Sequence, residues 1–277
     1  MSDQPSTARQ AFFVPDGDLL VPRPLARGPW GPTLHGRVFG ALCAREVERH
    51  RAADPDLACV RLTVDIFRAG ALAPVGIDTR VIRAGRRILV IEATISQDGA
   101  AIGQGKAVLL RRSEQPEGQL PRTPRWEVPT PLDGDPRLVA SEDGPTAMWQ
   151  SWTLAEDADA EGAARQFRLR HGLWMRELHD LVEGEDPTPL VRLAAAADVA
   201  HPVGNSSAAG LGFINADYTV YLGREPRGDY IGIQPDGHIS EAGVGVAQCI
   251  GHDLDGPFGF IATAALANSM ARANAGG

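Results

Sequence analysis

The strongest candidate for chemistry in this sequence is a single carboxylate inside an apolar helical stretch. Asp198 follows four consecutive alanines in the segment LAAAADVA, residues 193–200. A carboxylate in apolar surroundings costs free energy unless it is paired or put to use, and burial raises its basicity. Asp198 is therefore a candidate general base. The alternative is that it faces solvent or caps a neighbouring backbone group.

His35 and Gly36 form the second candidate, because they stand where a long helical pattern begins. The first N–H groups of a helix lack intrahelical partners and lie at the positive end of its dipole, so they can stabilise a developing oxyanion. Gly36 would let a ligand approach this backbone closely. An ordinary helix start with a locally packed histidine explains the same residues.

A row of polar residues opens a predicted strand in the second part of the chain. Strand alternation places Asn215 and Asp217 on one face together with Thr219. Such a row can be aimed at a substrate or a water, and the alternative is a row that faces solvent.

Arginines gather at two places along the sequence. Three crowd one predicted hairpin and four flank the exit from the first predicted sheet: Arg83, Arg86 and Arg87, then Arg111, Arg112, Arg122 and Arg125. Either group can bind an anion, and a solvated basic rim is the alternative. The net charge of -8 argues against nucleic acid or an anionic bilayer as the main partner.

These residues are positioned by a pattern that occurs twice. VDIFR at residues 64–68, followed by Asp98 and Gly99, is echoed by VYLGR at 220–224, followed by Asp255 and Gly256. The offset between the two copies is near 156 to 157. Each copy contains three runs with strand character, at 76–83, 88–96 and 101–110 and again at 230–234, 243–251 and 258–266. A helical pattern precedes each meander, at 33–50 and 187–200. The sequence therefore predicts two α+β halves in tandem.

The predicted division is a first unit at residues 1–112, a proline-rich linker at 113–150 and a second unit at 151–277. Residues 164–170 are expected to form a strand, and 139–149 suggest no function.

The first thirty residues contain neither a signal peptide nor a membrane span, so we expect a cytoplasmic protein. Three isolated cysteines make disulfides and a zinc site improbable. The fingerprints of serine hydrolases, P-loop NTPases, zincins and Rossmann proteins are absent from the sequence.

The order of several motifs resembles the TesB-like acyl-CoA thioesterases, which are tandem double-hotdog proteins. The motifs are HGxxxGALxAR at 35–45, RLTVDIFRAG at 61–70, RxGRR at 83–87, QDG at 97–99 and INADYTVYLGR at 214–224. The resemblance implies two long central helices, each wrapped by a curled antiparallel sheet. It also implies that the acid of one unit faces the helix start of the other.

In this family an Asp near the end of the second central helix, a Thr on the following strand and a Gln on the last strand hold a water against the thioester carbonyl. Asp198 matches the Asp, and Asn215 stands at the Thr position. The Gln position falls on Thr263 or Ala264, so Thr263 is the remaining candidate to orient water. The resemblance places His35 and Gly36 at the carbonyl.

The function implied is hydrolysis of an acyl-CoA or related acyl thioester, without a metal or other cofactor. Arg83, Arg86 and Arg87 are the candidates for the CoA phosphates, and pairing of hotdog sheets is the candidate route to a homo-oligomer. The alternative is a non-catalytic acyl-CoA binding protein that has lost the family Gln. A hotdog hydratase ranks last, because its expected Asp and His helix pattern is not visible in the sequence.

Overall fold

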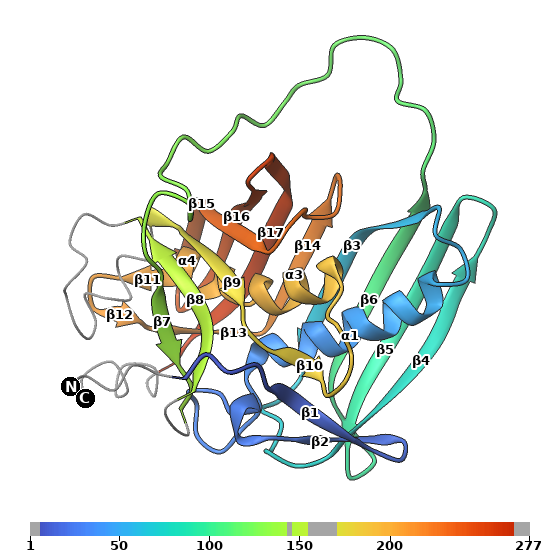
Figure 1. Cartoon of the computed structure of the whole chain (residues 1–277), viewed down its shortest axis with the longest axis vertical. Coiled ribbons are helices and arrows are strands. Elements are labelled where there is room, and N and C mark those ends of the chain that lie inside the picture. The colour runs from blue at the N-terminus through green and yellow to red at the C-terminus, as the bar shows by residue number, and fades with distance from the viewer. Residues whose placement is uncertain (1–5, 143–145, 155–170, 269–277) are drawn as a thin grey trace.

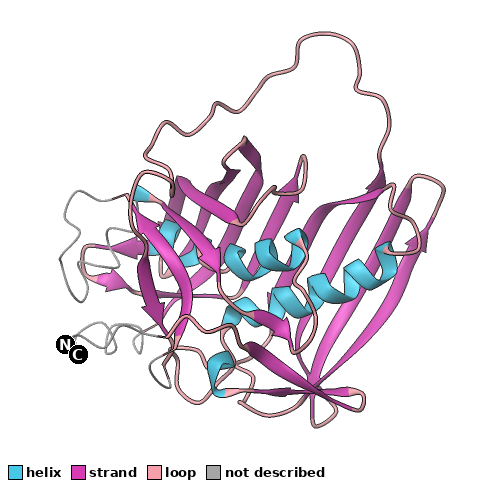
Figure 2. Cartoon of the chain, in the orientation of Figure 1, coloured by secondary structure: helices cyan, strands magenta, loops and turns pink. Residues whose placement is uncertain are grey.

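The two predicted repeats share one large, mostly antiparallel sheet, with helices packed on one face (Figures 1 and 2). The computed structural model describes residues 6–142, 146–154 and 171–268. Up to Arg111 the elements are β1 (Ala11–Asp16), β2 (Leu19–Pro22), η1 (Pro24–Ala26), α1 (Gly36–Arg51), β3 (Leu57–Ile66), β4 (Val75–Ala84), β5 (Ile88–Gln97) and β6 (Ala100–Arg111).

The elements after the linker begin with β7 (Arg137–Ala140), β8 (Ala147–Thr153), β9 (Leu173–Glu177), β10 (Asp180–Val182), α3 (Pro189–Ala197), α4 (Ala200–Asn205), β11 (Ser206–Ser207) and β12 (Gly210–Leu211). They continue with β13 (Phe213–Asn215), β14 (Asp217–Leu222), β15 (Tyr230–Glu241), β16 (Val244–Asp253) and β17 (Gly256–Ala267). Below, the first repeat means α1 with β3–β6, and the second repeat means α3 and α4 with β14–β17.

The repeats meet in the middle of the sheet, where β3 pairs with β14. The strand order is β4-β5-β6-β3 on one side and β14-β17-β16-β15 on the other. Thr63 lies opposite Thr219, with 3.1 Å between the hydroxyl oxygens. The two threonines are 156 positions apart, which is the offset that the sequence repeat predicts. Outward from the β3–β14 pair, corresponding strands of the two repeats therefore follow in the same order.

The six predicted strands of the two meanders are confirmed as β4, β5, β6, β15, β16 and β17. Where helices cover one face of a strand, its side chains alternate between that buried face and the other face. On β14, for example, Tyr218, Val220 and Leu222 are buried, whereas Tyr221 is exposed. This alternation follows from the two-residue period of a strand with one covered face.

The first predicted helix is confirmed as α1. His35 precedes it and accepts a hydrogen bond from the Arg37 N–H through Nδ1, which is the role of an N-cap. Basic residues occupy its last turn, where they oppose the negative end of the helix dipole.

The expectation of a second long central helix at 187–200 is wrong. Thr188 caps α3, but this helix ends at Ala197, and the short α4 begins at Ala200. Pro202 supplies the physical reason. Within a continuous helix its ring would collide with the carbonyl four residues earlier, which belongs to Asp198, and it has no N–H to donate. The chain therefore breaks at Asp198.

The segment expected to be a linker crosses from one side of the sheet to the other (Figure 1). Residues 113–136 contain no strand or helix, but β7 begins at Arg137 and pairs with β8. The strand expected at 164–170 lies outside the described residues. The division into units at 1–112 and 151–277 stays a prediction.

Strands near the two ends of the sheet bridge between the repeats. β10, which follows β9, pairs in parallel with β1, and Ser6 bridges to Thr146 just before β8. Each side of the sheet thus contributes backbone pairing to the other.

Candidate active site

Asp198 lies at the break between α3 and α4 and faces the start of α1 in the first repeat. A side chain on Gly36 would place its Cβ 2.7 Å from Asp198 Oδ1 and 3.0 Å from Oδ2. Only glycine allows this approach, because carbon atoms do not come so close to a carboxylate oxygen. The structure therefore brings together the two groups that the sequence singles out first.

The Asp198 carboxylate is buried and has two polar neighbours. Asn215 Nδ2 donates to Oδ1 at 3.0 Å, and His35 Nδ1 lies 3.5 Å from Oδ2. Burial is the largest influence and raises the pKa of Asp198, but the contacts with His35 and Asn215 outweigh this rise, so the net pKa lies below the ordinary aspartate value. The carboxylate is therefore ionised at neutral pH.

His35 Nδ1 has two possible partners, and they need opposite proton states. It accepts from the Arg37 N–H at 3.3 Å when it carries no proton, and it can donate to Asp198 only when it carries one. Capping of α1 and pairing with Asp198 are therefore alternatives. Whether Nδ1 carries a proton decides which of the two contacts forms.

A second glycine continues the close contact between α1 and the second repeat. Gly40 lies one turn after Gly36, and a Cβ there would overlap the Tyr218 hydroxyl, which donates to the Ala194 carbonyl at 2.8 Å. Tyr218 is fully buried, and its pKa is raised chiefly by burial. The Gly-xxx-Gly spacing at 36 and 40 is the sequence signal that indicates this contact.

Thr263 belongs to a neighbouring polar network. Its Oγ1 accepts from Asn205 Nδ2 at 3.1 Å, and the same nitrogen lies 3.1 Å from His201 Nδ1. His201 Nε2 in turn donates to the Phe213 carbonyl at 3.1 Å. Burial lowers the pKa of His201, which favours its neutral form. The structure connects Thr263 to α4 and shows no direct bond from it to Asp198.

Ala264, the other residue at the family Gln position, lies on the opposite face of β17. Its N–H donates to Asp217 Oδ1 at 2.7 Å. Asp217 and Ala264 both line an open groove of about 440 Å³. Burial raises the pKa of Asp217, and nearby Asp65 adds to the rise. Asn215 is the last residue of β13 and Asp217 is the first residue of β14. Asp217 therefore does not share the contact that Asn215 makes with Asp198.

Arg83, Arg86 and Arg87 lie far from Gly36. They are exposed around the turn that joins β4 to β5. His50, in the last turn of α1, contacts Thr79 on β4 at 3.0 Å, so the hairpin lies beyond the far end of the helix. Sixteen helical residues span about 24 Å. Binding of CoA phosphates by these arginines stays a prediction.

Sequence reasoning missed a buried ion pair directly beside Gly36. The Arg37 side chain is fully buried, pairs with Glu177 on β9 and lies over the Trp149 ring, 4.4 Å from its centroid. Burial raises the pKa of Glu177, and Arg37 opposes this rise. The pair joins the start of α1 to a strand 140 residues later. Nothing in the local pattern around Glu177 indicates this partner.

Within the part of the chain that the structure describes, no three His, Cys, Asp or Glu side chains gather as metal ligands. No described helix is both long and apolar enough to cross a membrane.

Comparison with known proteins identifies the family. Residues 26–110 match the acyl-CoA thioesterase N-terminal domain, and residues 124–263 match the acyl-CoA thioesterase C-terminal domain. The chain belongs to the acyl-CoA thioesterase family. No curated protein matches the sequence.

Solved structures share the fold at low identity. The tesB protein of Mycobacterium avium subsp. paratuberculosis has a TM-score of 0.60 and 14% identity over 92% of this chain and 95% of that one. A hot dog fold protein from Alicyclobacillus acidocaldarius has a TM-score of 0.62 and 18% identity over 97% and 98%. An acyl-CoA thioesterase II, TesB2, from Mycobacterium marinum has a TM-score of 0.53 and 15% identity over 83% and 89%. The chain therefore has the hotdog fold, with one long helix and one interrupted helix.

Proposed function

We propose that this protein hydrolyses acyl-CoA thioesters and that Asp198 is the general base. The observation that carries the proposal is the buried Asp198 carboxylate of the second repeat held against Gly36, the first residue of α1 in the first repeat. A base and a set of backbone donors on opposite sides of one point are what acyl transfer to water requires.

In the proposed reaction a water lies between Asp198 and the thioester carbonyl carbon. Asp198 accepts a proton as the water oxygen bonds to that carbon, and the negative charge moves to the carbonyl oxygen. The N–H groups at the start of α1 stabilise this oxyanion. The C–S bond then breaks, and the proton passes from Asp198 to the leaving thiolate, which yields free acid and CoA.

Asn215 supports this proposal because its amide fixes Asp198 Oδ1 and leaves Oδ2 nearer to His35. A lowered pKa makes Asp198 a weak base, so its contribution comes mainly from position. His35 Nδ1 can add a second restraint on the carboxylate when it carries a proton.

A second candidate is a binding protein that retains the acyl-CoA site without turnover. The observation that favours it is the fate of the family Gln position. Thr263 is bonded to Asn205, and Ala264 lies on the other face of β17. Neither residue supplies an amide to a water at Asp198.

The test is CoA release, detected with a thiol reagent, for several acyl chain lengths. Asp198→Asn is expected to lower kcat by roughly 10²-fold while acyl-CoA affinity is retained, because the base is lost and the shape is kept. Asp217→Asn is the matched control, since this acid does not contact Asp198, and its activity should stay within about twofold of wild type.

Two results would decide against hydrolysis by Asp198. If wild type binds acyl-CoA and releases no CoA above background, the binding protein is the correct function. If Asp198→Asn hydrolyses as fast as wild type, the base lies elsewhere.

A further inference from the structure

The segment between the repeats lies against β9 and β16 through one aromatic anchor. Trp126 packs on Trp174 at 5.7 Å between ring centroids and on His252 at 5.5 Å. A Cβ on Gly172 would come within 2.6 Å of the Trp126 ring. This contact fixes the chain just after Arg122 and Arg125.

An open groove of about 850 Å³ lies between this segment and the sheet. Part of its floor is one row of residues in register across four strands: Phe260 on β17, Tyr221 on β14, Arg61 on β3 and Val108 on β6. The segment contributes Arg122, Thr123 and Arg125. Tyr221 points away from the helices, because its neighbours Val220 and Leu222 are buried. This row therefore lies on the other face of the sheet from α3.

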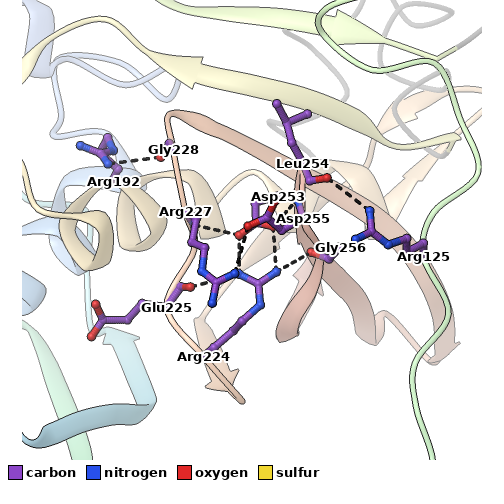
Figure 3. A network of polar contacts seen from close by, with 10 residues as sticks. All are labelled: Arg125, Arg192, Arg224, Glu225, Arg227, Gly228, Asp253, Leu254, Asp255 and Gly256. Carbon is purple, nitrogen blue, oxygen red and sulfur yellow. Dashed lines mark hydrogen bonds and ion pairs between the residues drawn. The ribbon is translucent and has the colours of Figure 1, made fainter.

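The groove combines exposed aromatic rings with unsatisfied positive charge. Tyr221 is 51% exposed and Phe260 is 41% exposed. Arg61 Nε is buried and has no hydrogen-bond partner among the described residues. Figure 3 shows Arg125 reaching from the segment to the Leu254 carbonyl, a contact of 3.5 Å that leaves most of its donors for other groups.

The acidic residue in the lining does not cancel this charge. Asp255 is paired with Arg227 at 3.0 Å, so its carboxylate already has a cation (Figure 3). Three guanidinium groups thus border one groove of a protein whose net charge is -8. Guanidinium groups bind phosphate through paired N–H donors, and aromatic side chains stack on flat rings.

We propose that this groove is a second ligand site and that it binds a phosphorylated purine, with the ring on Tyr221 and Phe260 and the phosphate on Arg61 and Arg122. The ligand can be a free nucleotide or the nucleotide end of a CoA compound, which present the same chemistry. The site lies on the other face of the sheet from Tyr218 and α3, and it does not depend on hydrolysis at Asp198.

The central β3–β14 pair provides an internal control. The pair of Thr63 and Thr219 separates the row of Arg61 and Tyr221 from a second row. In this second row Asp217 lies opposite Asp65, and Asp65 lies opposite Gln104. This row has the same strand pairing across β14, β3 and β6 but carries two carboxylates and no aromatic ring. It should repel phosphate.

The experiment is calorimetric titration of the full chain with ADP, with adenosine and inorganic phosphate as partial probes. ADP should bind more tightly than either probe, and its affinity should fall as salt is added. Arg61→Gln and Tyr221→Ala should each weaken ADP binding by about tenfold or more. Tyr221→Phe should retain it, because the ring that stacks is preserved.

Asp65→Asn is the matched control on the opposite row, and Asp198→Asn is the control for the first site. Both should bind ADP as wild type does.

Displacement of ADP by free CoA would identify the nucleotide end of CoA as a ligand, and failure of CoA to compete would identify the free nucleotide. The proposal is overturned if ADP does not bind at millimolar concentration, or if Arg61→Gln and Tyr221→Ala both bind it as tightly as wild type. Loss of CoA release with intact ADP binding would refute only the hydrolase.

Discussion

The last residues of β5 and β16, Gln97 and Asp253, bind equivalent loops through different kinds of contact. Gln97 Oε1 accepts from the Ala71 N–H at 2.9 Å, and Asp253 Oδ2 accepts from the Arg227 N–H at 2.8 Å. Donors and acceptors are both 156 positions apart. Gln97 completes its contacts with neutral bonds to the Ala71 and Ala73 carbonyls. Asp253 instead forms a two-pronged ion pair with Arg224 (Figure 3).

The helices of the two repeats differ more strongly. α1 continues without interruption through Leu42, which is fully buried. The residue 156 positions later is Asp198, where the second helix breaks. In both comparisons the first repeat has a neutral or apolar residue where the second repeat has a carboxylate: Gln97 corresponds to Asp253, and Leu42 corresponds to Asp198.

The largest expected effect comes from placing an acid in the uninterrupted helix. Leu42→Asp should lower the free energy of unfolding by at least about 4 kcal/mol, because the buried carboxylate would meet an apolar core. Asp198→Asn, measured in the same urea titration, should cost less than about 2 kcal/mol, because Asn215 and His35 can still bond to an amide. Equal costs would mean that the two helix positions do not differ in their environment.

The two turns should differ by a smaller amount. Asp253→Ala should destabilise the protein by about 3 kcal/mol, because it strands Arg224 and frees the Arg227 N–H. Gln97→Ala removes neutral hydrogen bonds only and should cost about 1–2 kcal/mol. Urea unfolding of both variants tests the order, and a larger loss from Gln97→Ala would contradict the ion pair's role.

The smallest expected effect is a pH dependence confined to the second repeat. His252 packs against Trp126, and burial lowers its pKa to about 4. Between the ordinary histidine value of about 6.5 and about 4, the unfolded chain binds a proton that the folded protein does not, so stability falls as pH falls through this window.

His252→Gln should remove this part of the pH dependence. The comparison is the free energy of unfolding of wild type and variant at pH 7 and pH 5. Wild type should lose more stability than the variant over this interval. Equal losses would show that His252 does not titrate differently on folding.

Much of the frame could be predicted from sequence because it depends on local pattern. The six meander strands follow from alternation, α1 follows from its apolar face and its start, and the offset of 156 follows from the repeated VDIFR and VYLGR segments. The break at Asp198 was also accessible, since Pro202 excludes the helical carbonyl four residues before it. The apolar residues run through that point and by themselves favour a continuous helix, but the steric effect of Pro202 outweighs them.

The candidate site was predicted in part. Asp198, Gly36 and Asn215 come together as expected, but Thr263 bonds to Asn205 instead, and the arginines of the β4–β5 hairpin lie beyond the opposite end of α1. Residue types and spacing indicate which groups are unusual. They do not indicate which of two faces or which distant strand each group will meet.

The sequence by itself determined the duplication, the strands and the placement of one carboxylate at the end of an apolar helix, because these depend on periods of two and 3.6 residues and on local turn residues. Only the tertiary structure decided that this carboxylate meets the helix start of the other repeat, that Arg37 pairs with Glu177, and that Arg61 and Tyr221 share a groove with the linker. Each of these contacts joins residues more than 100 positions apart or pairs neighbouring strands in register. Such contacts form only when the two repeats pack along β3 and β14.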